Sequence, residues 1–144
     1  MADWNWKHCT EDFILLIEAG FIAVNQADED SALKLFKAAE LLNPTDQLSK
    51  IGMGYLYLHM LDLKKASKLF EEALEAEPKN EVAKAMLGIS MSLDPNMSEK
   101  AEKILNQTHS SSDKSIQNLS DVALDFVNRF IKKAPSPVQG QTKK

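Results

Sequence analysis

The histidines and the single cysteine are the side chains in this 144-residue chain best suited to nucleophilic or metal chemistry. His8, His59 and His109 lie far apart in the sequence, and Cys9 directly follows His8. Adjacent side chains of a helix or strand point in different directions, so adjacency alone does not make this pair a nucleophile and its base. The sequence has no Cys-x-x-Cys pair, no glycine-rich phosphate loop and no acidic calcium loop. We therefore expect no enzyme activity, no metal and no cofactor.

Composition favours a single folded domain that is soluble in water. Apolar residues make up 44% of the chain and charged residues 26%, and the net charge of −4 argues against nucleic acid as a partner. The longest apolar stretch, 13–24, contains Glu18 and is too short to span a membrane, so we expect no membrane insertion. One cysteine cannot form an intrachain disulfide, and the first residues lack the features of a secretory signal. These features predict a cytoplasmic protein.

The chain contains an internal repeat, which is the strongest signal in the sequence. Gly20, Gly54 and Gly88 recur at a spacing of 34 residues. The same spacing relates four further pairs, which are Ala32 and Ala66, Phe36 and Phe70, Ala39 and Ala73, and Pro44 and Pro78. Between these positions apolar residues follow a helical period, with charged residues opposite. Each unit is therefore predicted to be two helices.

These residues resemble the tetratricopeptide repeat family, whose 34-residue unit is a helical hairpin with small or aromatic residues at fixed places. The first repeat covers 13–46, the second 47–80, and a degenerate third 81–107. The resemblance implies an all-α fold of three such hairpins in a short right-handed superhelix. Small residues let paired helices approach closely, and we expect the tightest contact at Gly54.

The segments outside the repeats have separate predictions. Residues 113–133 carry an apolar stripe and are expected to form a C-terminal capping helix that covers the last repeat, with a self-association or ligand surface as the alternative. Residues 134–144 are expected to be a flexible tail. Residues 1–12 form an N-terminal leader, in which Trp4 and Trp6 either pack on the first repeat or form an exposed docking point.

The resemblance also implies a peptide-binding groove. In the family, the second, fifth, ninth and twelfth residues of each repeat line the concave surface, and eleven of the twelve here are apolar or aromatic. These are Ile14, Ile17, Phe21, Val24, Leu48, Ile51, Tyr55, Leu58, Val82, Ala85 and Ile89. Other apolar residues fill the packing positions, so we expect this set to face water. The alternative is that some of these side chains bury against a neighbouring repeat, or that the C-terminal helix folds back over them.

The groove residues indicate the chemistry of the partner. Family members that clamp a chaperone's terminal carboxylate use Lys, Asn and Arg, and the equivalent places here hold Ile17, Phe21, Gly52, Val82 and Met86. We therefore expect no carboxylate clamp. An apolar groove instead suits an amphipathic or apolar helix that binds by burying its apolar side chains.

By its size, acidic charge and apolar groove, the chain resembles the small bacterial type III secretion chaperones. The resemblance implies a chaperone in the bacterial cytoplasm that holds an apolar or amphipathic helix of a secreted protein, either alone or in a hetero-oligomer with a small co-chaperone. The needle-subunit branch is favoured over the translocator branch, because no long dimerisation helix precedes the first repeat. The alternative is a structural adaptor that bridges folded partners through its convex or edge surfaces.

Overall fold

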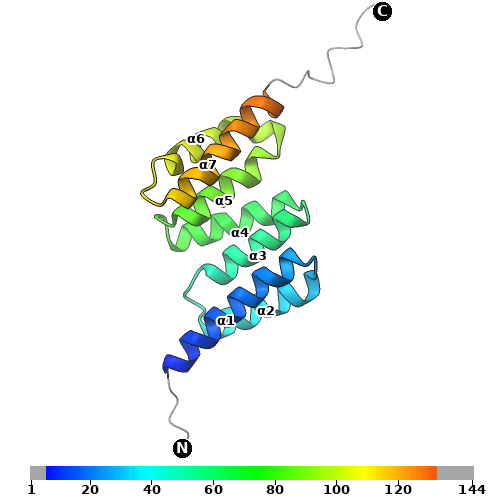
Figure 1. The fold of residues 1–144 in the computed structure, drawn as a ribbon, viewed down its shortest axis with the longest axis vertical. Helices are drawn as coiled ribbons and strands as arrows, with labels where there is room; N and C mark the ends of the chain where they lie inside the picture. The colour runs from blue at the N-terminus through cyan, green and yellow to red at the C-terminus, as the bar shows by residue number, and fades with distance from the viewer. Residues whose placement is uncertain (1–5, 133–144) are drawn as a thin grey trace, which may run out of the picture.

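The computed structural model describes residues 6–132, with side chains from residue 9 onward, and shows a stack of helices (Figure 1). The described range holds seven α-helices and no β-strand. They are α1 (Trp6–Asn25), α2 (Glu29–Leu42), α3 (Leu48–His59), α4 (Leu63–Ala76), α5 (Glu81–Ser92), α6 (Ser98–His109) and α7 (Lys114–Phe126). The first six form three stacked hairpins, and α7 packs on α5 and α6. This arrangement confirms the predicted all-α superhelix with a C-terminal capping helix.

The first helix is longer than the sequence analysis predicted. Helix α1 begins at Trp6, so residues that were assigned to the leader are helical. The reason is that no glycine or proline between Trp6 and Phe13 interrupts the helix. Trp4 and the side chain of Trp6 lie outside the described residues, as does the expected tail 134–144.

Side-chain caps set the starts of the second helices in the first two hairpins. Asp28 accepts a hydrogen bond from the backbone N–H of Ser31 at 3.1 Å, and Asp62 accepts one from that of Lys65 at 3.2 Å. Hydrogen bonds from the side chain and backbone of Ser31 lower the pKa of Asp28. The pKa of Asp62 is lowered in the same way, first by the backbone and then by the side chain of Lys65. The two capping residues occupy equivalent positions in the first and second repeats.

The turns before these caps contain a strained backbone position. Ala27 and Leu61 both have φ of 58°, in the left-handed region where glycine is usual at the end of a helix. The next residue closes the turn in each case, with N–H to O distances of 2.9 Å from Asp28 to Ala23 and from Asp62 to Tyr57. The third hairpin turns differently, through a short 3-10 helix at Pro95–Met97.

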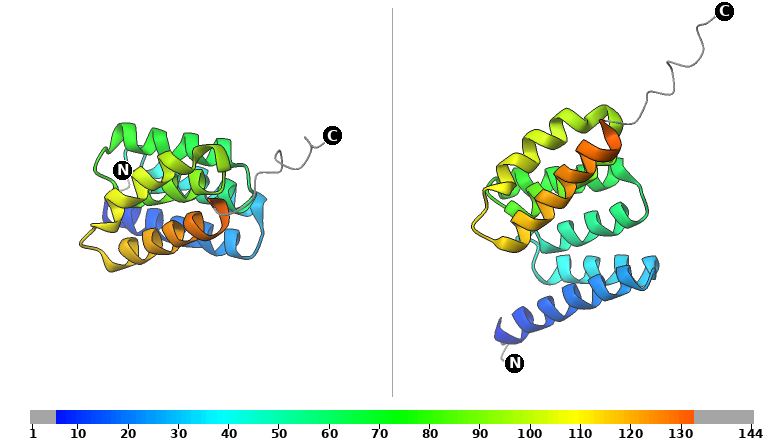
Figure 2. Two further views of the ribbon diagram at one scale, coloured as in Figure 1. Left: turned by 90° about the horizontal axis from the view of Figure 1, so that it is seen from above. Right: turned by 45° about the horizontal axis from the view of Figure 1, so that its top comes forward.

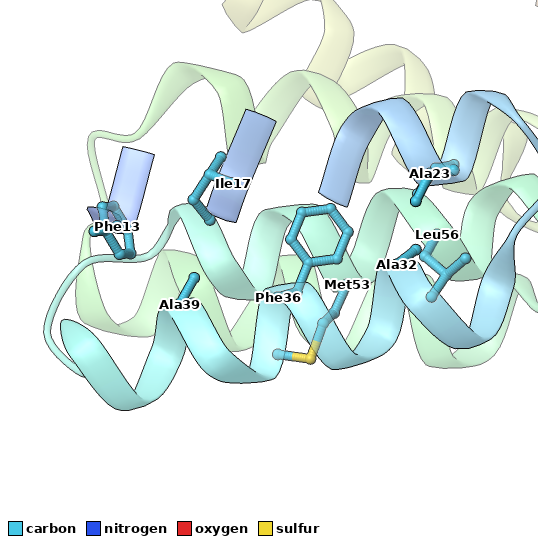
Figure 3. Packing of buried hydrophobic residues seen from close by; sticks show 9 residues of the cluster. Phe13, Ile17, Ala23, Ala32, Phe36, Ala39, Met53 and Leu56 are labelled. Carbon is cyan, nitrogen blue, oxygen red and sulfur yellow. The ribbon is translucent and has the colours of Figure 1, made fainter. Parts of the chain in front are cut away.

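Phe36 holds the first two hairpins together. It is completely buried, and its ring lies in a core with Ile17 and Met53 (Figure 3). A Cβ atom added to Gly20 would lie 2.5 Å from this ring, and one added to Gly52 would lie even closer. An added Cβ on Gly54 would lie 2.5 Å from Phe70. The prediction that Gly54 makes the tightest contact is therefore wrong, because Gly52 must admit an aromatic ring from the preceding repeat.

Helix α7 is fixed to α6 by polar contacts. The hydroxyl groups of Thr108 and Ser120 are hydrogen-bonded at 2.7 Å, and both side chains are buried. His109 contacts Asp121 at the surface. Beyond Phe126 the chain continues as a π-helical segment, Val127–Ile131, closed by a 3.0 Å hydrogen bond from the N–H of Lys132 to the carbonyl of Val127. The predicted helix over 113–133 is thus an α-helix followed by a π-helical turn.

Candidate functional site

The predicted groove residues lie on one helix of each hairpin. Ile14 and Phe21 on α1, Leu48 and Tyr55 on α3, and Val82 and Ile89 on α5 are three pairs of residues seven apart. Seven residues are about two helical turns, so the members of each pair share one face of their helix. All six side chains remain partly or well exposed. These six residues and Leu58 are the members of the predicted groove that stay accessible, and we refer to them as the concave groove.

Aromatic contacts join α1 to α3 at the middle of the concave groove. The rings of Phe21 and Tyr55 lie 5.4 Å apart, and Phe21 also meets the buried ring of Phe36 edge-on at 5.3 Å. The Tyr55 hydroxyl donates a hydrogen bond to Oδ1 of Asn25 at 3.3 Å. The His59 ring lies 4.4 Å from the Tyr55 ring. Tyr55 therefore forms part of the groove wall and also contributes to packing between repeats.

Four of the eleven predicted groove residues are buried in the core, so the expectation that the whole set faces water is wrong. Ile17, Val24 and Ile51 are at most 5% exposed, and Ala85 is completely buried. The physical reason is the close side-by-side packing of the hairpins, which turns part of this helix face toward the neighbouring helices. Ile17 and Val24 join the core around Phe36, and Ile51 joins the next core.

Helix α7 adds an apolar pocket at the end of the concave groove. The pocket has a volume of about 220 Å³ and lies between α5 and α7. Its lining residues are Ile89, Ser92, Leu93, Leu119, Val122, Ala123 and Phe126. Val122 is 69% exposed and was not predicted as a site residue. Its position three residues after Leu119, on the apolar stripe of the C-terminal helix, was the signal that could have identified it.

Seen from above, the terminal helices α1 and α7 lie on one side of the molecule, and α4 lies on the opposite side (Figure 2, left). Helix α7 stands beside α5 and covers part of one end of the concave groove, while Ile14 and Val82 are each 40% exposed.

The residues best suited to catalysis do not come together. His59 lies at the end of α3 against Tyr55, whereas His109 lies at the end of α6 against Asp121. Residues 9–132 contain no group of three or more His, Cys, Asp or Glu side chains that could hold a metal ion. No helix in the described part of the chain is long and apolar enough to cross a membrane.

Comparison with known proteins supports the architecture. No family model matches the sequence, and no curated protein matches it. Among solved structures, the chain is similar to the tetratricopeptide repeat domain of Arabidopsis OM64, with a TM-score of 0.68 and 15% sequence identity. The match covers 83% of this chain and 97% of that domain. At this identity the likeness concerns the fold, which is that of a tetratricopeptide repeat domain.

Proposed function

We propose that this protein is a non-catalytic protein-binding module that holds an apolar or amphipathic helix of another protein in the concave groove. The observation that carries the proposal is that the groove side chains left accessible after packing are all apolar or aromatic. Ile14, Leu48 and Val82 form one row across the three hairpins, and Phe21, Tyr55 and Ile89 form a second. An amphipathic helix presents side chains at similar spacing and binds such a surface by removing apolar area from water.

The same observation supports a more specific role. We propose a chaperone of a type III secretion system, in the bacterial cytoplasm, that keeps a helical segment of a secreted subunit from aggregating. A small acidic chain with an apolar groove suits this role, and the needle-subunit branch remains the favoured one. A small co-chaperone would make the complex a hetero-oligomer. The competing proposal is an adaptor that bridges folded proteins through its convex face.

A charge placed in the concave groove tests the proposal. Val82 is preferable to Tyr55, because Tyr55 also contacts Phe21 and Asn25 between repeats. Val82 lies in the first turn of α5, where a glutamate interacts favourably with the helix dipole, so Val82→Glu should leave the fold intact. Burying that charge against an apolar partner without a counter-charge would cost several kcal/mol, on the order of 2–7 kcal/mol for a polar group alone. Partner binding should therefore be lost.

Leu41→Glu is the matched control, since Leu41 is 84% exposed on α2, which is not a groove helix. Each variant is used to capture partners from the source cell, and the captured proteins are identified by mass spectrometry alongside thermal melts. Val82→Glu should lose a partner that the wild type and Leu41→Glu retain. If Val82→Glu binds normally and Leu41→Glu fails, the adaptor is the better explanation.

A further inference from the structure

The outer side of α1 carries a second apolar surface, which adjoins the concave groove at the start of α1, where Ile14 and Leu15 line one pocket. Leu15 and Ile22 lie two helical turns apart on this side and are 60% and 57% exposed. Leu42, at the end of α2, lies beside Leu15 and lines a pocket of about 500 Å³ with Asp12, Leu16 and Ala19. We call Asp12, Leu15, Leu16, Glu18, Ala19, Ile22 and Leu42 the α1 outer face.

The repeat shows what normally covers this side of the first helix of a hairpin. The residues equivalent to Leu15 in the next two repeats are Ser49 and Ala83, which are both completely buried. Those equivalent to Ile22 are Leu56 and Ser90, which are 2% and 1% exposed. They are buried because the second helix of the preceding hairpin packs over them.

Two contacts identify these covering helices. Ser90 is hydrogen-bonded to Ser67 of α4 at 2.9 Å, and Leu56 lies in the same core as Phe36 of α2. In the first repeat no helix of the described chain takes this place. The corresponding positions there nevertheless carry larger apolar side chains, Leu15 and Ile22, in place of Ser49 and Ser90. The α1 outer face therefore has the geometry and the chemistry of a helix-docking surface.

Within the described residues no segment covers the α1 outer face. The C-terminal helix α7 lies at the other end of the stack (Figure 1). The place that α2 and α4 take over the later repeats is therefore left to a helix from outside the described part of the chain.

Charge distinguishes a second copy of this chain from a different protein. Glu18 is exposed, forms no ion pair within the described residues, and lies between Leu15 and Ile22. Two copies paired through this face about a two-fold axis would bring Glu18 of one copy close to Glu18 of the other, and like charges repel. Asp12 adds a second negative charge beside Leu15. A partner surface that complements the charge of the α1 outer face is therefore basic.

We propose that the α1 outer face docks an amphipathic helix of a second protein, with apolar residues about seven apart and lysine or arginine between them. The apolar side chains would pack on Leu15, Ile22 and Leu42, and the basic side chains would face Glu18 and Asp12. Leu15 and Ile22 each lie one residue, about 100° around the helix, from Ile14 and Phe21 of the concave groove, so the protein would hold two helices at once. It would also extend the helical stack at the end that α7 does not cap.

The test uses two synthetic helical peptides as probes. One has leucines seven residues apart with lysines between them, and the matched peptide has glutamates in place of the lysines. Binding is measured by fluorescence anisotropy at low salt, and the binding surface is mapped from amide chemical shifts of the full ¹⁵N-labelled chain. We expect the basic probe to bind at least about tenfold more tightly than the acidic probe, with the largest chemical shift changes in residues 12–25 of α1.

Exposed variants make the test specific. Ile22→Ser should weaken binding of the basic probe by about tenfold, and Glu18→Lys should reverse the preference between the two probes. Both side chains are exposed, so thermal melts should be close to wild type. Val82→Glu, in the concave groove, should retain the chemical shift changes on α1, which separates this proposal from the proposed function.

Two outcomes would overturn the proposal. One is a set of chemical shifts centred on α3 and α5 that Val82→Glu removes, since the probe would then occupy the concave groove. The other is a concentration-dependent dimer in sedimentation that Ile22→Ser dissociates, since the occupant would then be a second copy of this chain.

Discussion

Gly52→Ala probes the contact between the first two hairpins most directly. A Cβ at this position would lie within 3.0 Å of three atoms of the Phe36 ring. The ring cannot retreat, because Phe36 is completely buried and its ring also lies close to Gly20 on α1, where an added Cβ would be 2.5 Å away. Overpacking of this kind costs about 1–3 kcal/mol. Alanine in place of glycine inside a helix recovers about 1 kcal/mol.

Because the ring cannot retreat, we expect an overpacking cost in the upper part of that range, about 2–3 kcal/mol, and therefore a net loss of about 1–2 kcal/mol in the free energy of unfolding. For a domain of this size that corresponds to a fall of about 3–6 °C in the melting temperature. The measurement is urea and thermal unfolding followed by circular dichroism. Gly88→Ala is the comparison, because its closest neighbour is the branched end of Leu105, which can adjust more easily than an aromatic ring. Gly88→Ala should therefore lower the free energy of unfolding by less than Gly52→Ala does.

A double-mutant cycle tests the assigned cause. Phe36→Leu replaces the aromatic ring with a smaller side chain. If the added methyl group clashes with the ring, Gly52→Ala should lower the free energy of unfolding less in Phe36→Leu than in the wild type. The coupling energy between the two substitutions should then be about 1 kcal/mol or more. Additive effects, or a Gly52→Ala protein that melts at or above the wild-type temperature, would refute the reasoning.

Three further predictions concern turns, the capping helix and pH. Leu61→Gly should raise the free energy of unfolding by about 0.5–1 kcal/mol in urea titrations, because glycine relieves the left-handed backbone at this exposed position. Ser120→Ala should cost about 1 kcal/mol and speed amide exchange in α7, measured by mass spectrometry, because it removes the buried hydrogen bond to Thr108. Asp28 and Asp62 have lowered pKa values, so the stability they contribute is present above about pH 3.9 and is lost as the pH falls through their lower folded values. Melts from pH 5 to pH 2 should show this loss, and the variants Asp28→Asn and Asp62→Asn should reduce it.

The helical hairpins could be predicted because their signals are local and periodic. Gly20, Gly54 and Gly88 repeat at one spacing, and apolar residues between them follow the helical period. Both signals depend on residues close in the chain, and the structure confirms the hairpins they indicate. The same local reasoning located the capping helix. It did not foresee that α1 would begin at Trp6, because a helix start without a strong cap leaves little trace in the sequence.

Tertiary packing determines how far each apolar side chain is buried. Ile14 and Ile17 lie on the same helix and have the same residue type, yet Ile14 is 40% exposed and Ile17 is 5% exposed. A helical period shows which residues share a face, but the angle and distance to neighbouring helices determine how far across that face the contact extends. The same reason explains why Gly52, and not Gly54, admits the closest ring.

The sequence by itself therefore determined the number, order and type of the helices, since these follow from propensity and period along the chain. The tertiary structure decided which apolar residues remain accessible. Tyr55 contributes both to the groove and to packing between repeats, and Leu15 and Ile22 stay exposed because no helix in the described part of the chain covers that side of α1. Accessibility depends on contacts between residues far apart in the chain, which the helical period does not encode.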